Sequence, residues 1–320
     1  MSRPIQYHNG VPWSPTVPTK IQRKIRKVVT IDSRDRVAQG GATDANGMLL
    51  PLNSSYSVQL PDSLKNVISV KLVTAEIPLS FYQFNSSTRT PFMVVNGTMS
   101  FKHSSGSTLT ASVNGSFATA SALGTAVAAA MNIAANVNTY SASVSATTGL
   151  LTITNSAVGF TLYPATDALS TNTDWGLAYY LGFLKTGSYV SPSAGESVSG
   201  VHPVIFQPYT SLLMELNLFN KIDETSTTNR SGNKDAYFAK IPIAGIAPFT
   251  NYYFPEASNF INQTTLNPPL NKVQTLNVTF RFHDGSRPYF LNAEHSFTLE
   301  FEILEGTFDD FSSVENGASL

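Results

Sequence analysis

Two stretches near the C-terminus of this chain, residues 276–283 and 297–303, carry a large apolar side chain at every second position. In the second stretch these residues are Phe297, Leu299, Phe301 and Ile303. A β-strand sends successive side chains to opposite faces, so a period of two predicts strands with one buried side and one solvent-facing side.

Shorter stretches show the same alternation, at residues 56–60, 66–77, 91–95, 212–218 and 236–243. Pro61 and Asp62 predict a turn between the first two, and the proline-rich residues 244–271 are predicted to be mostly loop. With the C-terminal pair this makes seven or eight strands, the number in a two-sheet antiparallel Greek-key or jelly-roll sandwich. We therefore predict an all-β fold.

Residues 97–183 have a different pattern and contain only three Asp, Glu, Lys or Arg residues. Residues 117–135 are rich in alanine and place Leu123, Val127 and Met131 on one helical face. Short strands are predicted on either side, at residues 99–103, 109–113, 140–144 and 150–154. We interpret this segment as a small α+β subdomain inserted into a loop of the sandwich.

Four prolines in the first eighteen residues predict an extended N-terminal arm. Residues 20–29 fit either a short amphipathic helix or an edge strand. The predicted divisions are residues 1–36 as a basic extended arm, 37–96 and 184–306 as the two parts of the sandwich, 97–183 as the insertion, and 307–320 as an acidic tail.

Charge differs between the two ends of the chain. Residues 1–36 hold eight Lys or Arg against two Asp, a net +6, whereas no basic residue follows Arg287. The predicted partner-contact residues of the basic arm are Lys20, Arg23, Lys24, Arg26 and Lys27. Nucleic acid is a poor partner because the segment lacks aromatic residues for base stacking, and anionic lipid headgroups are a second possible partner. We favour the acidic surface of a neighbouring subunit.

Composition narrows the classes of protein further. Only 13% of residues are charged, about half of the usual share, and Ser, Thr and Asn supply the remaining polarity. Such a surface costs little to desolvate and suits tiling against neighbours. The absence of cysteine excludes disulfides and thiolate metal sites. No apolar run is long enough for a membrane span.

The densest polar cluster comprises Asp32, Arg34, Asp35 and Arg36. It could clamp a neighbour through arginine–carboxylate pairs, or it could be an internal turn whose carboxylates accept backbone N–H groups. We favour the internal turn.

A metal site could be built from two imidazoles and two carboxylates, those of His283, Asp284, Glu294 and His295. However, Asp-Gly after a strand is a common turn, so we predict no metal and no cofactor. Serine-nucleophile, phosphate-loop and zinc-protease motifs are missing from the sequence. We therefore predict no catalytic residues and no enzymatic activity.

Four segments, residues 30–36, 56–61, 73–78 and 294–302, together resemble the minor capsid and penton (vertex) proteins of large icosahedral double-stranded DNA viruses, the chlorella viruses and their relatives. The resemblance implies a jelly-roll capsid component in the virion, assembled in the host cytoplasm as an oligomer. Its implied partners are the major capsid protein and neighbouring minor capsid proteins.

A second function stays open at this point. A spike or fibre-type module could bind host glycan through the insertion, where Trp175, Tyr179 and Tyr180 offer aromatic rings for sugar stacking.

Overall fold

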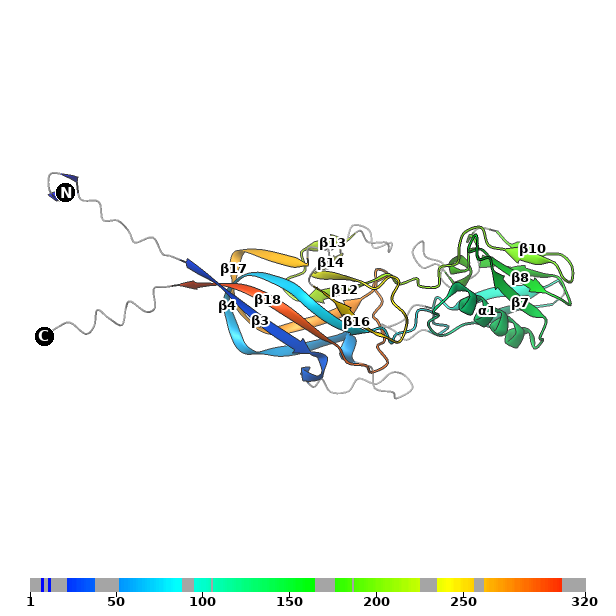
Figure 1. Ribbon diagram of the computed structural model, residues 1–320, viewed down its shortest axis with the longest axis horizontal. Coiled ribbons are helices and arrows are strands. Elements are labelled where there is room, and N and C mark those ends of the chain that lie inside the picture. Colours follow the sequence, from blue (N-terminus) through cyan, green and yellow to red (C-terminus); the bar gives the residue numbers. More distant parts are fainter. Residues whose placement is uncertain are drawn as a thin grey trace.

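The computed structural model describes residues 7–8, 11–12, 22–37, 52–87, 95–104, 106–164, 176–185, 187–224, 235–255 and 262–306. The protein is elongated (Figure 1). A large β structure occupies the middle, and a smaller domain with a helix lies at one end. The start of strand β3 (Gln22–Asp32) and the end of β18 (Ser296–Gly306) lie at the opposite end.

Two long strands form the backbone of the sandwich. β4 (Ser55–Pro78) and β17 (Gln263–Arg281) pair in antiparallel fashion, with register shifts between Thr265 and Leu270 and between Val273 and Thr275. Pro61 in β4 and the prolines at 268–269 in β17 fall in this bent region. The bent pair therefore passes from one layer of the sandwich into the other.

Strand order identifies the fold. In one layer the first part of β4 pairs with β17, β17 with β12 (Ser211–Leu216), and β12 with β15 (Ala239–Pro242). In the other layer β3 pairs with β18, β18 with the second part of β4, and β4 with both β16 (Asn251–Phe254) and the start of β17. Two facing layers rolled from one long ribbon make a jelly roll, so the predicted all-β jelly-roll sandwich is confirmed.

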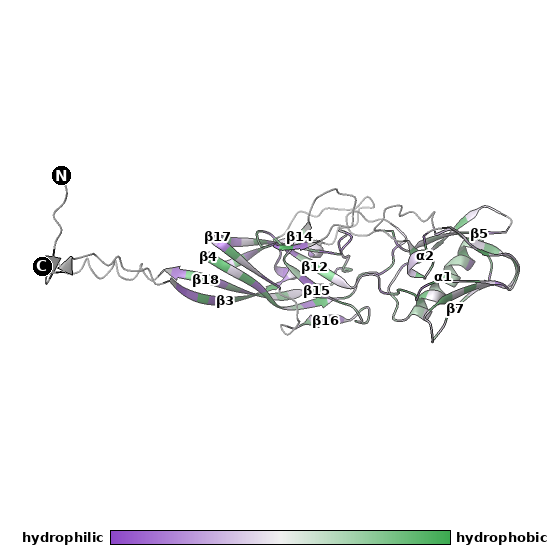
Figure 2. Ribbon diagram, turned by 90° about the horizontal axis from the view of Figure 1, so that it is seen from above, coloured by the Kyte–Doolittle hydropathy of each residue, from purple (hydrophilic) through white to green (hydrophobic). Residues whose placement is uncertain are grey.

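A single hydrophobic core lies between the two layers and contains the inward side chains of both. Figure 2 shows the resulting alternation of hydrophobic and hydrophilic residues along β3, β4, β17 and β18. The fully buried phenylalanines of this core are Phe219, Phe238, Phe254, Phe280, Phe290, Phe297 and Phe301.

Two local predictions need correction, and a third is not tested. Residues 61–62 form a bend inside the 24-residue strand β4 and not a turn between two strands. Residues 244–271 contain β16 and the first part of β17, because the prolines at 268–269 sit where the ladder is irregular. The strand predicted at 91–95 lies almost entirely outside the described residues.

The insertion has its own core, built from residues between Phe84 and Val204. Helix α1 (Ala120–Ala135) starts at Thr119, whose side chain accepts a hydrogen bond from Ala122 N, and ends at Asn136 in the left-handed conformation. The insertion contains helices α1 and α2 (Leu177–Tyr180). Its strands are β5 (Thr98–His103), β6 (Thr108–Ser112), β7 (Tyr140–Val144), β8 (Leu151–Asn155), β9 (Phe160–Leu162), β10 (Tyr189–Ser191) and β11 (Ser197–Ser199).

The insertion is longer than the predicted 97–183. β10 pairs with β9 and β11 pairs with β8, so the chain returns to the sandwich only after its two small sheets are complete. The remaining elements are β1 (Tyr7–His8), β2 (Val11–Pro12), β13 (Ile222–Glu224), β14 (Asp235–Tyr237) and the 3₁₀ turns η1 (Ser33–Asp35) and η2 (Leu52–Ser54).

The predicted arm of residues 1–36 is also corrected. Residues 22–32 form β3, an edge strand of the sandwich, rather than an extended segment without a core. Ile31 is buried and Val29 packs against the core, whereas a helix would have required a 3.6-residue period. Residues 13–21 and 307–320, and with them Lys20 and the acidic tail, lie outside the described residues.

We predict that Phe297→Ala lowers the free energy of unfolding by about 3–5 kcal/mol, because it leaves a cavity in the sandwich core. Thr298→Ala, its neighbour on the exposed face of β18, should cost less than about 1 kcal/mol. Urea unfolding measures both. Equal losses in the two variants would contradict the assigned inner and outer faces of this strand.

Candidate functional site

The candidate site is the edge of the sandwich formed by β3, together with the η1 corner that follows it. β3 pairs with β18 along all eleven of its residues. Among the described strands none pairs with its other side. An edge strand presents free backbone N–H and C=O groups, which can bind another chain. Val28, near the middle of this edge, has 59% of its surface exposed.

The basic residues of the site are placed on β3. Arg23 and Lys24 are exposed, and Arg26 lies 3.8 Å from Glu300 and 3.7 Å from Glu302 across the ladder. Lys27 Nζ donates to Asp62 Oδ2 at 2.9 Å. The acidic groups that meet Arg26 and Lys27 are therefore in the same chain, at β18 and the bend of β4.

Opposite charges from the two ends of the chain thus cancel inside one sheet. β3 carries four basic residues, and β18 carries three glutamates opposite or beside them. Within the described residues, Arg26 and Lys27 are therefore balanced inside one subunit, and contact of the basic residues with a neighbour's acidic surface stays a prediction.

The polar cluster after β3 is a compact internal corner. Asp32 caps η1, because its Oδ1 accepts hydrogen bonds at 2.9 Å from both the backbone N and the Nε of Arg34. These hydrogen bonds from Arg34 lower the pKa of Asp32 to about 2. Asp35 is exposed on the same turn. The Asp32–Arg34 contacts match the internal turn that the sequence favoured.

Arg36 ties this corner to the segment before β18. Its Nη1 donates to both carboxylate oxygens of Glu294 at 2.9 Å and to the carbonyl of Ser33 at 2.7 Å. Ser33 Oγ also donates to Glu294. Two further hydrogen bonds link Ser33 to His295, the residue that follows Glu294. Ser33 N donates to the carbonyl of His295, and His295 N donates to Ser33 Oγ, both at 2.9 Å.

The imidazole of His295 lies beneath these bonds and is only 3% exposed. Its Nε2 is 2.9 Å from the hydroxyl of Tyr56. The rings of Tyr56, Phe280 and Phe290 surround it at centroid distances of 5.5, 4.8 and 5.4 Å. Burial lowers the pKa of His295 to about 4, although the nearby carboxylates of Glu294 and Asp32 oppose this effect. The same burial raises the pKa of Tyr56.

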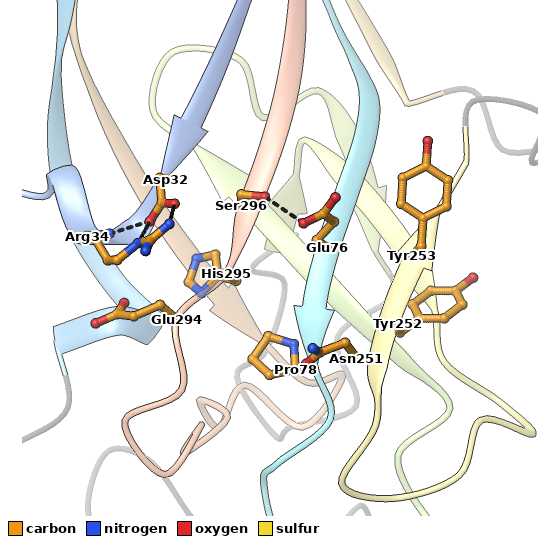
Figure 3. A pocket seen from close by; sticks show the side chains of 10 residues that line it. All are labelled: Asp32, Arg34, Glu76, Pro78, Asn251, Tyr252, Tyr253, Glu294, His295 and Ser296. Carbon is orange, nitrogen blue, oxygen red and sulfur yellow. Dashed lines mark hydrogen bonds and ion pairs between the residues drawn. The ribbon is translucent and has the colours of Figure 1, made fainter.

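A pocket of about 420 Å³ opens beside the corner, with side chains from four neighbouring strands around it (Figure 3). Register places Asp32, Ser296, Glu76 and Tyr253 side by side across β3, β18, β4 and β16. Ser296 Oγ donates to Glu76 at 3.3 Å. Carboxylates, tyrosine rings and Pro78 line this depression in the outer face of the sheet, so its wall is partly polar and partly apolar.

The four residues that were considered as metal ligands do not come together in one site. His283 is exposed, and Asp284 Oδ1 accepts from the backbone N of Ser286 at 2.9 Å. Glu294 binds Arg36, and His295 binds Tyr56. Within the described part of the chain, no three His, Asp or Glu residues group in a way that could hold a metal ion.

The aromatic residues named for glycan binding fall in different surroundings. Tyr180 packs edge-on against Phe84 at 5.9 Å, and Tyr179 lies 4.9 Å from the ring of His202. Trp175 is outside the described residues. None of the described helices is long and apolar enough to cross a membrane.

Sequence analysis missed Ser33 and Tyr56, and it considered His295 only as a metal ligand. Segments containing all three had been noted as motifs, but no local pattern indicated that residues 32–36 and 294–296 would meet. Their contact depends on strand pairing over more than 250 positions of the chain.

No family model matches the chain, and no curated protein matches it. Among solved structures, the mavirus penton protein is similar at 12% sequence identity and a TM-score of 0.40, over 88% of this chain and 99% of that chain. The Sputnik virophage structure is similar at 13% identity and a TM-score of 0.38, over 86% of this chain and 98% of that chain. Likenesses at these TM-scores carry no weight here, and the fold rests on the strand order of this chain.

We predict that Tyr56→Phe lowers the free energy of unfolding at pH 7 by about 1–2 kcal/mol, because it removes the hydrogen-bond partner of a buried imidazole. Tyr253→Phe, at an exposed tyrosine of the same sheet, is the matched control and should change it by less than about 0.5 kcal/mol. Chemical denaturation of both variants measures the difference. If Tyr56→Phe were neutral, His295 would not depend on this hydroxyl.

Proposed function

We propose that this protein is a non-enzymatic structural subunit of the capsid of a large icosahedral double-stranded DNA virus. In this proposal it is a minor capsid protein or a penton subunit. It joins neighbouring capsid proteins through the edge of β3 and the residues that precede it, including Lys20. It is assembled in the host cytoplasm and functions in the virion.

The observation that carries this proposal is the placement of contact surfaces at opposite ends of a jelly roll (Figure 1). The β3–β18 ribbon, with its open edge, runs toward one end, and the inserted domain lies at the other. One end can then pair with a shell while the other stays free. Jelly rolls serve in viral capsids and in lectins, so the fold alone does not decide the function.

The polar surface supports the same proposal. Few charges and many hydroxyl and amide groups allow large surfaces to be buried at low desolvation cost. Many weak contacts of this kind add up in a lattice, because each bond raises the effective concentration of the next. A ring of subunits requires a head-to-tail interface, in which the β3 edge of one copy meets a different surface of the next.

Protein partners suit the site better than anionic lipid or nucleic acid. Glu300, Glu302 and Asp62 already face Arg26 and Lys27, which reduces the positive potential available to phosphate groups. The glycan-binding alternative receives less support, because Tyr180 packs against Phe84.

The exposed end of β3 provides the test. Arg23→Gln with Lys24→Gln removes two exposed cations without disturbing the core, and we predict at least a tenfold lower occupancy in assembled particles, an effect of about 1.4 kcal/mol. Occupancy relative to the major capsid protein can be measured by quantitative mass spectrometry of purified particles. Lys272→Gln, an exposed lysine on the bent part of β17, is the control and should incorporate normally.

Normal occupancy of the β3 variant would refute the proposed contact. Absence of the wild-type protein from purified particles would refute the capsid role itself.

A further inference from the structure

The end of β3 is held in the sandwich by a small number of bonds, and His295 lies at their centre. Across the corner, Ser33 exchanges two hydrogen bonds with the backbone N–H and carbonyl of His295, and Arg36 binds Glu294. A separate backbone bond links the corner to β4 and runs from Val37 N to the carbonyl of Ser57, at 2.8 Å. A change that shifts the backbone of His295 therefore breaks two of the bonds that hold this corner.

The site is built for a neutral imidazole. Three aromatic rings, from β4, β17 and the segment before β18, enclose His295, and its Nδ1 has no hydrogen-bond partner within the described part of the protein. A protonated ring needs an acceptor at each nitrogen. Tyr56 can accept at Nε2, but the second proton would be buried without a partner, at a cost of desolvation.

Nearby charges do not remove this cost. Glu294 and Asp32 favour the cation, but Glu294 is bound to Arg36 and Ser33, and Asp32 is bound to Arg34. The positive charge of Arg36 opposes it. The charged groups that face His295 from β3, its corner and its own segment are thus already paired with one another.

We propose that His295 is an acid-sensitive latch on the edge strand. Protonation expels the imidazole from its aromatic cage, and the backbone of residue 295 shifts with it. This shift breaks the bonds between the η1 corner and the segment before β18 and frees the C-terminal part of β3. The latch itself is a property of the isolated protein. Its consequence for subunit contacts, a weaker β3 interface in acidic surroundings, rests on the proposed capsid function.

The direction of the effect follows from proton linkage. In the open state the imidazole has its ordinary pKa of 6.5, whereas in the closed state the pKa is lowered to about 4. Between these values the open state binds the proton and the closed state does not, so acid favours opening. The closed state is fully favoured above pH 6.5, and this advantage is lost as the pH falls toward 4. From pH 7 to pH 5 the opening constant should rise roughly 20-fold.

Local opening is favoured over global unfolding because β3 is an edge strand. Among the described strands, β3 pairs with β18 only, whereas β18 and β17 each have a paired strand on both sides. Edge elements with few buried contacts open at lower cost than central strands.

The protein contains no cysteine, so a single introduced thiol can report on each position. Ile31→Cys places the reporter on the buried face of β3, and Thr30→Cys places it on the exposed face of the same strand. The reagent 4,4′-dithiodipyridine reacts with thiols in acidic solution, and the ratio of the two rates cancels its intrinsic pH dependence. We expect the relative rate at position 31 to rise roughly 20-fold from pH 7 to pH 5.

His295→Gln is the decisive variant, because its amide can still reach the Tyr56 hydroxyl but does not titrate. In this background the relative rate should change less than about twofold over the same range. His283→Gln, at an exposed histidine, is the matched control and should keep the full response. An acid response that persists in His295→Gln, or no response in the parent, would overturn the latch.

A third reporter separates local from global opening. Val278→Cys lies on β17 in the core of the opposite layer. Protection there should persist at pH 5, and its loss in parallel with position 31 would show that the whole sandwich unfolds and would refute the latch. These measurements use the isolated protein, so their outcome does not depend on whether the protein is found in particles.

Discussion

The antiparallel pairing of β3 with β18 is the interaction on which the rest of this structure depends. It brings the two ends of a 320-residue chain into one ladder of eleven residue pairs. Phe297 and Phe301 on β18 and Ile31 on β3 cover one side of the core as a result. The same pairing sets basic residues against glutamates and places the corner after β3 against Glu294 and His295. Fold, charge balance and candidate site all follow from one register.

Alternation alone was sufficient to predict the C-terminal part of β17, β18 and most of β4, because residues buried on one face of a sheet must recur with a period of two. It could not decide the state of residues 20–29. Ile21, Ile25 and Val28 fit a helical period, while Ile25, Val29 and Ile31 fit a strand, and only the presence of β18 favours the second. Proline content also led to a wrong prediction of loop at β16 and the first part of β17. An edge strand or a bulge can accommodate proline, so these residues form strands despite it.

The candidate site was predictable only in its local part. Asp32 and Arg34 are two residues apart, so their turn could be inferred from sequence. The burial of His295 could not be inferred, because its cage comes from Tyr56, Phe280 and Phe290 on segments distant in sequence. Its neutral state is therefore a tertiary property. The same pairing that forms the edge thus places a buried imidazole beside it.

The central claim, that β3 is an integral strand in register with β18, can be tested with a pair of cysteines in this cysteine-free chain. Thr30 and Thr298 lie directly opposite each other, with their hydroxyl oxygens 3.1 Å apart. Thr30→Cys with Thr298→Cys should form a disulfide within the monomer under mild oxidation, because paired strands place Cα atoms about 4.5–5.5 Å apart. Peptide mass mapping would detect it, and Thr30→Cys with Glu302→Cys, two pairs further along the same face, should not cross-link. Disulfides found only between molecules, or equal yields in the two variants, would contradict this register and the account built on it.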